Sequence, residues 1–174
     1  MKRITATLAA LGLFTVFSIA QAGAAPLYVE RVDLPIKSTM SEINSNLHAA
    51  GYKIVLKLNI LKLVEAQQKS LKIPDFDAVH FTDVRALVFC NPYDFSKLLN
   101  TYWPSAAACP LNLTVFGRGQ NSYIVYGERT AYAGTSTANK KVAESIDQGV
   151  IKALQQIPMS RALHKIPDWV APAA

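Results

Sequence analysis

The apolar residues of this chain recur with two different periods, and the change between them predicts strands that alternate with helices. Where every second residue is apolar, or where a short apolar run occurs, the pattern predicts a β-strand. Such segments lie at residues 27–34, 52–60, 81–90, 111–116 and 122–126. Helical spacing of apolar residues predicts helices at residues 40–50, 61–71, 92–103 and 137–157. The order β-α-β-α-β-α-β-β-α predicts the α+β class with α/β-like interleaving, as one mixed sheet of about five strands with helices packed on it.

Short polar motifs predict the ends of the first and third of these helices. Thr39-Met-Ser-Glu42 matches a capping box, so Thr39 is the expected N-cap, and Gly51 is the expected C-terminal cap. Asn91 followed by Pro92 combines a favoured N-cap with a proline at the first helical position. The third helix should bury one apolar stripe, which consists of Phe95, Leu98, Leu99 and Tyr102.

The second predicted strand carries apolar residues at every second position. This pattern predicts a half-buried strand whose buried face consists of Ile54, Leu56, Leu58 and Ile60. Lys53 and Lys57 are expected together on the opposite face. Because no interleaved arginine and aromatic residues accompany these lysines, the pattern favours a solvated face over an anion-binding or membrane-binding patch.

The N-terminus has the organisation of a secretory signal peptide. Lys2 and Arg3 form a short positive segment, and residues 4–20 carry no charge. Ala20-Gln21-Ala22 then supplies the small residues that precede signal cleavage. We therefore expect cleavage after Ala22 and export of the mature chain to a bacterial periplasm. The mature chain contains no apolar stretch long enough to span a bilayer.

Composition agrees with one exported domain of ordinary globular character. The 174 residues are 51% hydrophobic and 17% charged, which excludes an intrinsically disordered chain. Once Lys2 and Arg3 are removed, sixteen basic residues remain against twelve acidic ones, so the net charge falls from +6 to +4. Nucleic acid is not an expected partner in a periplasm. The length suits one core, which we expect over residues 27–157, with an irregular tail over 158–174.

Cys90 and Cys109 are the residues most informative about function. Cys90 comes one residue before the expected N-cap Asn91, where backbone N–H groups and the helix dipole stabilise a thiolate. Three interpretations remain open: a disulfide between the two cysteines in an oxidising compartment, inert buried thiols, or a functional thiol. A bridge would stabilise the fold by about 3 kcal/mol in the chain-entropy treatment. The intervening helix carries the chain about 18 Å away before it returns, so the sequence permits the bridge without requiring it.

Motifs for metals, cofactors and catalysis are absent or weak. His48, His80 and His164 are weak candidates for metal ligands, because they lack the spacing of a known metal motif. Cys109-Pro110 resembles the Cys-Pro dipeptide of some haem-binding proteins. The chain contains no Gly-x-Ser-x-Gly nucleophile elbow. No cofactor and no catalytic residue are therefore predicted.

A strand that ends in Phe89-Cys90-Asn91-Pro92 and leads into a helix is the most specific motif of the chain. It is accompanied by three further segments, at residues 47–52, 69–76 and 109–116. Together these motifs resemble the bacterial and archaeal family called domain of unknown function 302, over roughly residues 27–129. The resemblance implies a small mixed-sheet fold and supplies no settled activity. It also makes the helix predicted over residues 137–157 an expected addition to the family domain.

These observations favour an exported, non-catalytic domain that binds a small ligand or a periplasmic partner protein. The alternative is a thiol-dependent redox protein in which Cys90 reacts and Cys109 resolves the intermediate. Carriage of haem or a metal ion is a weaker alternative. An exposed edge strand would also make a homodimer possible.

Overall fold

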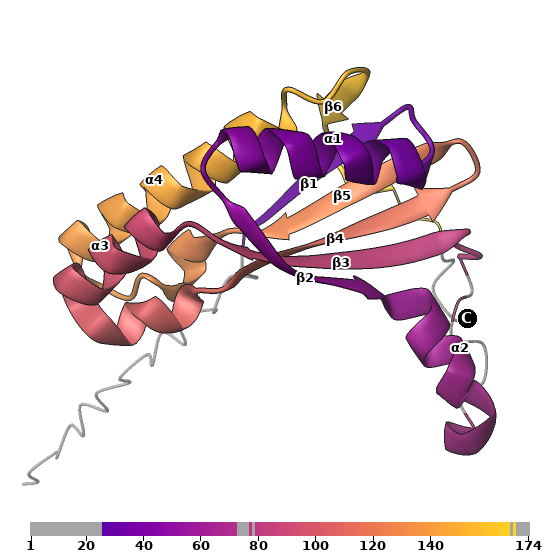
Figure 1. Cartoon of the computed structure of the whole chain (residues 1–174), viewed down its shortest axis with the longest axis horizontal. Helices are drawn as coiled ribbons and strands as arrows, with labels where there is room; N and C mark the ends of the chain where they lie inside the picture. The colour runs from indigo at the N-terminus through magenta and orange to yellow at the C-terminus, as the bar shows by residue number, and fades with distance from the viewer. Residues whose placement is uncertain (1–25, 73–76, 78, 168, 170–174) are drawn as a thin grey trace, which may run out of the picture.

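The sheet holds six strands. The computed structural model describes residues 26–72, 77, 79–167 and 169, and the predicted signal peptide lies outside them. The strands are β1 (Leu27–Val32), β2 (Lys53–Asn59), β3 (Asp83–Cys90), β4 (Leu111–Arg118), β5 (Asn121–Gly127) and β6 (Ser160–Ala162). Their order across the sheet is β2-β3-β4-β5-β1-β6 (Figure 1).

The predicted α+β class and a single sheet of about five strands are confirmed, but the predicted mixed pairing is wrong. The sheet has a sixth strand, β6, and every neighbouring pair of strands is antiparallel rather than mixed. The pair β2 and β3 shows why. The helix α2 (Ile60–Leu71) follows β2 directly, and β3 then starts beside the end of β2, where Asn59 faces Arg85. The chain re-enters the sheet at the end that it left, which gives antiparallel pairing.

Two helices cover one face of the sheet and enclose the core. α1 (Ile36–Ala49) and α4 (Thr137–Leu154) lie across this face, and α3 (Pro92–Tyr102) stands at one end of it (Figure 1). The core consists of apolar residues from both layers, among them Leu47, Leu87, Leu113, Ile124 and Val150. Among the described residues, no helix has the length and apolar character needed to cross a bilayer.

The start of α1 differs from the predicted capping box, and that prediction is wrong. Pro35 is the N-cap, the helix begins at Ile36, and no side chain caps it. Thr39 lies inside the first turn, fully buried, and its hydroxyl donates to the carbonyl oxygen of Leu34 at 3.3 Å. The chain that enters the helix therefore occupies the hydroxyl that a capping box would need.

A β-bulge in β2 reverses the face predicted for most of this strand. Ile54 pairs with Phe89, which belongs to the core. The next pair is Leu56 with Val88, which leaves Val55 out of register. Since Val88 points to the opposite face from Phe89, Leu56 leaves the core face and is 47% exposed. The predicted buried face is wrong beyond Ile54, because one extra residue shifts the alternation.

The same bulge separates the two lysines that were expected to share a face. Lys53 faces Cys90 and Lys57 faces Leu87, and these two residues of β3 point to opposite sides of the sheet. Lys57 lies on the helix side, where its Nζ donates to Oδ1 of Asn44 in α1 at 2.9 Å. The strand therefore presents one lysine to each face.

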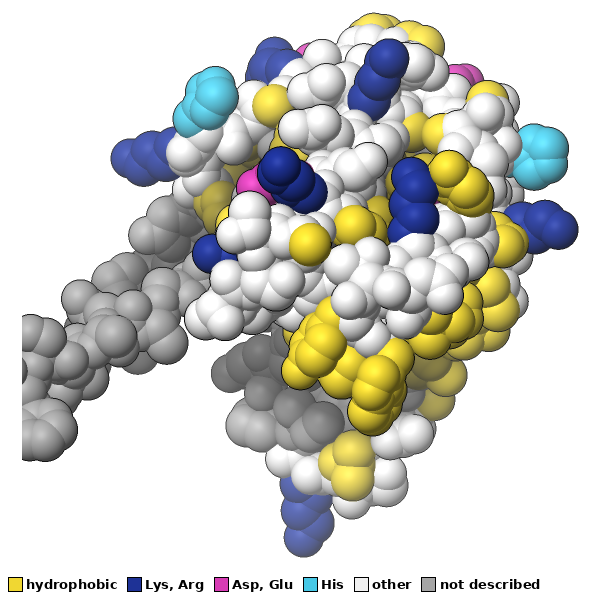
Figure 2. All heavy atoms as spheres, turned by 90° about the vertical axis from the view of Figure 1, so that its left-hand side faces the viewer, with side chains coloured by type: hydrophobic (Ala, Val, Ile, Leu, Met, Phe, Trp, Pro, Cys, Tyr) yellow, Lys and Arg dark blue, Asp and Glu magenta, His cyan; other side chains and the backbone are white. Residues whose placement is uncertain are grey.

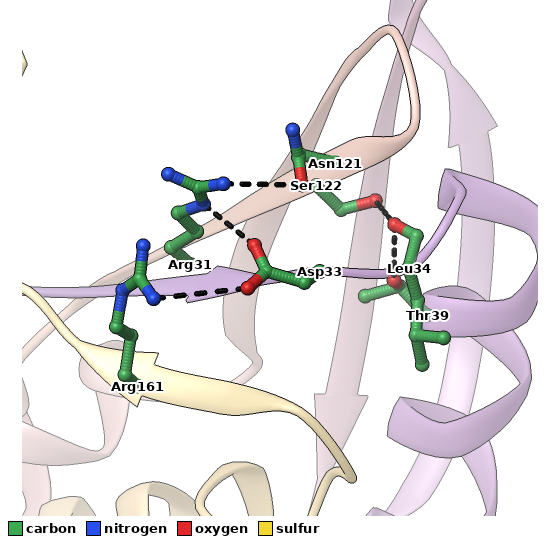
Figure 3. Close-up of polar contacts among 7 residues, drawn as sticks. All are labelled: Arg31, Asp33, Leu34, Thr39, Asn121, Ser122 and Arg161. Atoms are coloured by element: carbon green, nitrogen blue, oxygen red, sulfur yellow. Dashed lines mark hydrogen bonds and ion pairs between the residues drawn. The ribbon is translucent and has the colours of Figure 1, made fainter.

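The C-terminal segment contains a strand where the sequence predicts an irregular tail. β6 pairs with β1 at the edge of the sheet, and beside this junction Asp33 contacts two arginines, Arg31 and Arg161 (Figure 3). Its carboxylate accepts a hydrogen bond from Nε of Arg31 at 2.7 Å and lies 3.7 Å from Nη1 of Arg161. Arg31 also donates to Oδ1 of Asn121 at 3.3 Å, which connects β1 to β5. The contact with Arg161 thus adds a weak, largely solvated ion pair to the backbone pairing of β6 with β1.

Aromatic residues cover part of the face opposite α1 and α4. Trp169 packs edge-on against Phe81 and Tyr123, with ring centroids 5.9 and 4.6 Å apart. Phe81 also packs against Phe116, at a centroid distance of 5.0 Å. The guanidinium carbon of Arg118 lies 4.7 Å from the centre of the Trp169 ring. The described part of the tail is therefore attached to this second face.

Candidate functional site

Cys90 and Cys109 lie side by side at the end of the sheet where β3 leads into α3. β3 and β4 pair with Phe89 facing Leu111, so the residues that flank this pair are brought together. The two sulfur atoms are 3.0 Å apart and share a hydrogen bond. Both cysteines are partly buried, and Cys109 packs against the core. The fold thus places two thiols within reach of each other and of solvent.

Burial and the neighbouring sulfur make Cys109 a poor thiolate. Its pKa is raised to about 12, first by burial and then by the hydrogen bond and the charge interaction with Cys90. The guanidinium of Arg129 acts in the opposite direction and offsets this rise only in part. Reduced Cys109 is therefore protonated at neutral pH and is not a nucleophile by itself.

The start of α3 fixes the position of Cys90. As predicted, Asn91 caps the helix: its Oδ1 accepts a hydrogen bond from the backbone N–H of Tyr93 at 3.0 Å. Pro92 and Asp94 follow in the first turn, where a carboxylate suits the helix dipole. Burial raises the pKa of the Asp94 carboxyl. The thiol of Cys90 is thus held at the junction between a strand and a capped helix.

A buried aspartate organises the second part of the site. Asp147 of α4 is 3% exposed, and its Oδ1 accepts hydrogen bonds from Tyr126 Oη at 2.8 Å and from the backbone N–H of Arg129 at 2.7 Å. Its Oδ2 accepts from the backbone N–H of Thr130 at 3.0 Å. Burial, followed by the charge of Asp147, raises the pKa of Tyr126, which therefore remains a donor. These bonds join α4 and β5 to the 3₁₀ turn η2 (Arg129–Tyr132).

Arg129 carries a buried positive charge without a carboxylate partner among the described residues. The residue is 6% exposed, and none of the ion pairs within 4.0 Å in the described part of the chain includes it. Nη2 donates to Oδ1 of Asn112 at 3.4 Å, while Nε is buried and has no hydrogen-bond partner. The guanidinium carbon lies 5.7 and 5.5 Å from the ring centres of Tyr126 and Tyr132. Such incomplete pairing is uncommon for a buried arginine.

The same end of the molecule exposes large hydrophobic side chains, and Figure 2 shows that hydrophobic side chains reach the surface on this side. They belong to α3 and to the 3₁₀ helix η1 (Trp103–Ala108). We call this set the end patch, and it consists of Tyr93 (67% exposed), Leu99 (44%), Tyr102 (55%) and Trp103 (75%). The predicted burial of Leu99 and Tyr102 is wrong. α3 stands at the end of the sheet, where Leu98 is buried and Phe95 packs partly buried against the core.

The three histidines are not brought together with other metal ligands. His48 lies near the end of α1, His80 precedes β3 and His164 follows β6. Within residues 26–72, 77, 79–167 and 169, no group of three or more His, Cys, Asp or Glu side chains is placed to hold a metal ion. The structure therefore adds no support to the metal hypothesis.

The sequence prediction missed Arg129 and Asp147. Asp147 had a usable signal, because it follows Ile146 directly and lies one helical turn before Val150, on the side of the helix predicted to be buried. Arg129 had none, because it lies between a strand and a helix in a segment without a hydrophobic period. Its burial depends on α4 and β5 meeting around it.

The residues that a family model matches show whether α4 belongs to the family domain or is an addition to it. The family described as Domain of unknown function DUF302 matches residues 28–160. This chain belongs to that family. The DUF302 domain therefore includes α4 and reaches the start of β6, so the expectation that α4 is an addition to the domain is wrong.

A solved structure supports the fold of this DUF302 domain. The chain is similar to the crystal structure of an uncharacterized conserved DUF302 protein from Bacillus stearothermophilus, with 18% sequence identity and a TM-score of 0.64. The alignment covers 76% of this chain and 98% of that chain. At this identity the likeness supports the fold alone. No curated protein matches the chain.

Proposed function

We propose that this DUF302 protein is exported and binds a small ligand or a partner protein, without catalysis, at the end of the sheet that carries Cys90. The end patch carries this proposal. Large apolar side chains exposed together, as Trp103 and Tyr102 are, mark interaction surfaces because water solvates them poorly. Export is supported by the signal-peptide pattern that ends at Ala22.

In the oxidising compartment that we propose, Cys90 and Cys109 form a structural disulfide. The contact between the two sulfur atoms supports this pairing. The bridge would tie the start of α3 to the start of β4 and so fix the base of the end patch.

Isolation of the protein from a periplasmic fraction tests both location and binding. N-terminal sequencing should show a chain that begins after Ala22, and native mass spectrometry or mild crosslinking should reveal a bound species. A double variant, Tyr102→Ser with Trp103→Ser, should lose that species. Leu63→Ser, which removes an exposed apolar side chain of α2, should keep it. Wild-type protein without a bound species, or a double variant that retains it, would contradict the proposal.

A thiol-dependent redox role is the second candidate, and it is favoured by the contact between two partly exposed thiols. Its reaction would be thiol–disulfide exchange with a disulfide-containing compound. The S–S bond of that compound breaks, an S–S bond forms between Cys90 and Cys109, and the two protein protons leave with the two released thiols.

Thiol titration separates the two roles of the cysteine pair. The purified protein is equilibrated in glutathione buffers of graded potential, and free thiols are counted in denaturant. A structural disulfide should show no free thiol and should resist a mild reductant. A pair that opens and closes within the buffer range would instead support the redox role. Cys90→Ser should then abolish turnover with the disulfide compound.

A further inference from the structure

A cleft lies on the face of the sheet that α1 and α4 leave uncovered. Its floor consists of alternate residues from three neighbouring strands. Val29 of β1 lies opposite Val125 of β5, and Tyr123 of β5 lies opposite Phe116 of β4. Since Ile124 belongs to the core, the residues on either side of it point to this other face. The floor of the cleft is therefore regular sheet structure rather than a loop.

The described part of the C-terminal tail forms the other wall of this cleft. Ile166, Pro167 and Trp169 line it together with the strands, and so does Phe81, which precedes β3. The Trp169 ring packs edge-on against Phe81 and Tyr123, so the tail is attached to the floor on one side. The cleft has a volume of about 230 Å³ and is partly open to solvent. It therefore has room for a small molecule that enters from solvent.

The chemistry of the lining disfavours a charged ligand. The eight residues that line the cleft are all apolar or aromatic, and none is Asp, Glu, His, Lys or Arg. A carboxylate or a phosphate would lose its water shell there without gaining a partner. The guanidinium carbon of Arg118 lies 4.7 Å from the centre of the Trp169 ring, so a ligand cation would meet a like charge beside the cleft. An uncharged molecule meets neither penalty.

We propose that this cleft binds an uncharged aromatic molecule of one or two rings. Four of the eight lining side chains are aromatic, and aromatic rings favour edge-to-face and offset contacts with other rings. An apolar cavity of about 150 Å³ takes up benzene, so the volume of the cleft suffices for a somewhat larger molecule. Water gains little in this cleft, because an ordered water needs several polar partners. None of the end-patch residues lines the cleft, and the inference goes beyond the proposed function.

Titration calorimetry with defined probes tests this assignment. Benzyl alcohol, benzoate and cyclohexylmethanol are added separately to the mature protein at constant ionic strength. Benzyl alcohol should bind. Benzoate, which has a similar size and a negative charge, should bind about tenfold more weakly or worse. Cyclohexylmethanol, in which a saturated ring replaces the aromatic one, should bind about threefold more weakly.

Two matched variants place the binding in the cleft. Val125→Phe fills part of the cleft from its floor and should weaken benzyl alcohol binding about tenfold or more. Val88→Phe makes the same substitution on the same face of the sheet, outside the cleft, and should leave binding unchanged. If Val125→Phe does not fold, Trp169→Ala keeps the test decisive, because it removes a wall that belongs to the tail. Trp169→Ala should also weaken binding.

The fluorescence of Trp169 gives a second readout. The chain contains two tryptophans, so Trp103→Phe leaves Trp169 as the sole one. Benzyl alcohol should shift the emission of this variant to the blue, because the ligand displaces water from the indole ring. The midpoint of the shift should match the Kd from calorimetry. A tail that only packs against the sheet would not produce this shift.

The inference is overturned if wild type does not bind benzyl alcohol, or if benzoate or cyclohexylmethanol binds as tightly. It is also overturned if folded Val125→Phe or folded Trp169→Ala binds like wild type. The end-patch variant, Tyr102→Ser with Trp103→Ser, should keep benzyl alcohol binding while it loses the species bound in the periplasm. Failure of the cleft therefore leaves the function proposed for the end patch standing, and failure of the end patch leaves the cleft standing.

Discussion

Two buried carboxyl groups between the sheet and the helices are held in opposite ways, although their tyrosine donors, Tyr28 and Tyr126, face each other across β1 and β5. Asp147 accepts three hydrogen bonds shared between both of its oxygens. Glu30 of β1 is fully buried, yet only Oε2 accepts a bond, from Tyr28 Oη at 2.9 Å, and Oε1 has no partner. The difference lies in the supply of donors rather than in burial. A turn beside Asp147 directs two backbone N–H groups at it, whereas Glu30 lies within a regular sheet whose backbone is paired.

The number of hydrogen-bond donors around a buried carboxyl group also affects its pKa. Burial raises the pKa of Glu30, and the hydroxyl groups of Ser160 and Tyr28 near it offset the rise only in part. Burial thus shifts Glu30 towards its neutral acid form relative to a solvated glutamate, and that form needs fewer donors than a carboxylate. Asp147, by contrast, accepts hydrogen bonds from the backbone N–H groups of Arg129 and Thr130 in η2. Buried acids with similar exposure thus play different roles.

Removal of the better-supplied carboxylate should have the largest effect. Asp147→Ala leaves two backbone N–H groups and the hydroxyl of Tyr126 buried without an acceptor, so the free energy of unfolding should fall by about 3–5 kcal/mol. Glu144→Ala, at an exposed position of the same helix, should change it by about 0.5 kcal/mol or less. Urea denaturation monitored by circular dichroism measures both. Equal losses in the two variants would show that Asp147 does not organise the site.

The same substitution at the tyrosine donor of each acid compares the two acids directly. Tyr126→Phe removes a donor from Asp147 and should cost about 1.5 kcal/mol, whereas Tyr28→Phe removes one from Glu30 and should cost about 0.5 kcal/mol. The larger cost follows because Tyr126 is fully buried and Tyr28 is not. Urea unfolding at pH 7 gives both values. A larger loss in Tyr28→Phe would reverse the comparison.

Glu30→Gln should show the pH dependence of the less well-supplied acid. Because the folded-state pKa of Glu30 is raised, its contribution to stability is fully present below the ordinary value of 4.5 and is lost as the pH rises through the raised value. Gln keeps the shape and cannot ionise. The variant should match wild type at pH 4 and be more stable at pH 8, by less than Tyr126→Phe costs. Burial also raises the pKa values of Asp94 and Glu128, so the pH slope should shrink without vanishing. An unchanged slope would contradict this account.

The smallest effect is expected at the strand that closes over Glu30. Arg161→Ala breaks the long ion pair with Asp33, which is largely solvated, and should cost about 0.5 kcal/mol or less. The loss should disappear in high salt. Lys165→Ala removes a charge from the same segment and serves as the control. Thermal unfolding at two salt concentrations measures the difference, and a salt-independent loss would show that packing rather than charge holds this strand.

Local features of the chain were predictable, and features set by distant neighbours were not. The cap at Asn91 was correctly assigned because it depends on adjacent residues alone. The bulge at Val55 was missed because it depends on how β2 pairs with β3. The early start of α1 was missed because it depends on how the chain enters the helix at Pro35. The sequence pointed to Cys90 and Cys109 but left their distance open. It could not show that Arg129 and Asp147 meet, since their contact arises only when α4 packs on β5.

The position of β1 between β5 and β6 has a consequence for the order of folding. The first strand of the domain finds both of its partners near the C-terminal end of the chain, with Leu27 beside Gly127 and Val32 beside Ser160. Contacts of such long sequence separation form late and slowly, because most of the chain must be ordered to close them. During the export that we propose, β1 would cross the membrane first and would stay unpaired until β5 and β6 had followed. The topology itself would then delay folding until nearly the whole domain has been translocated.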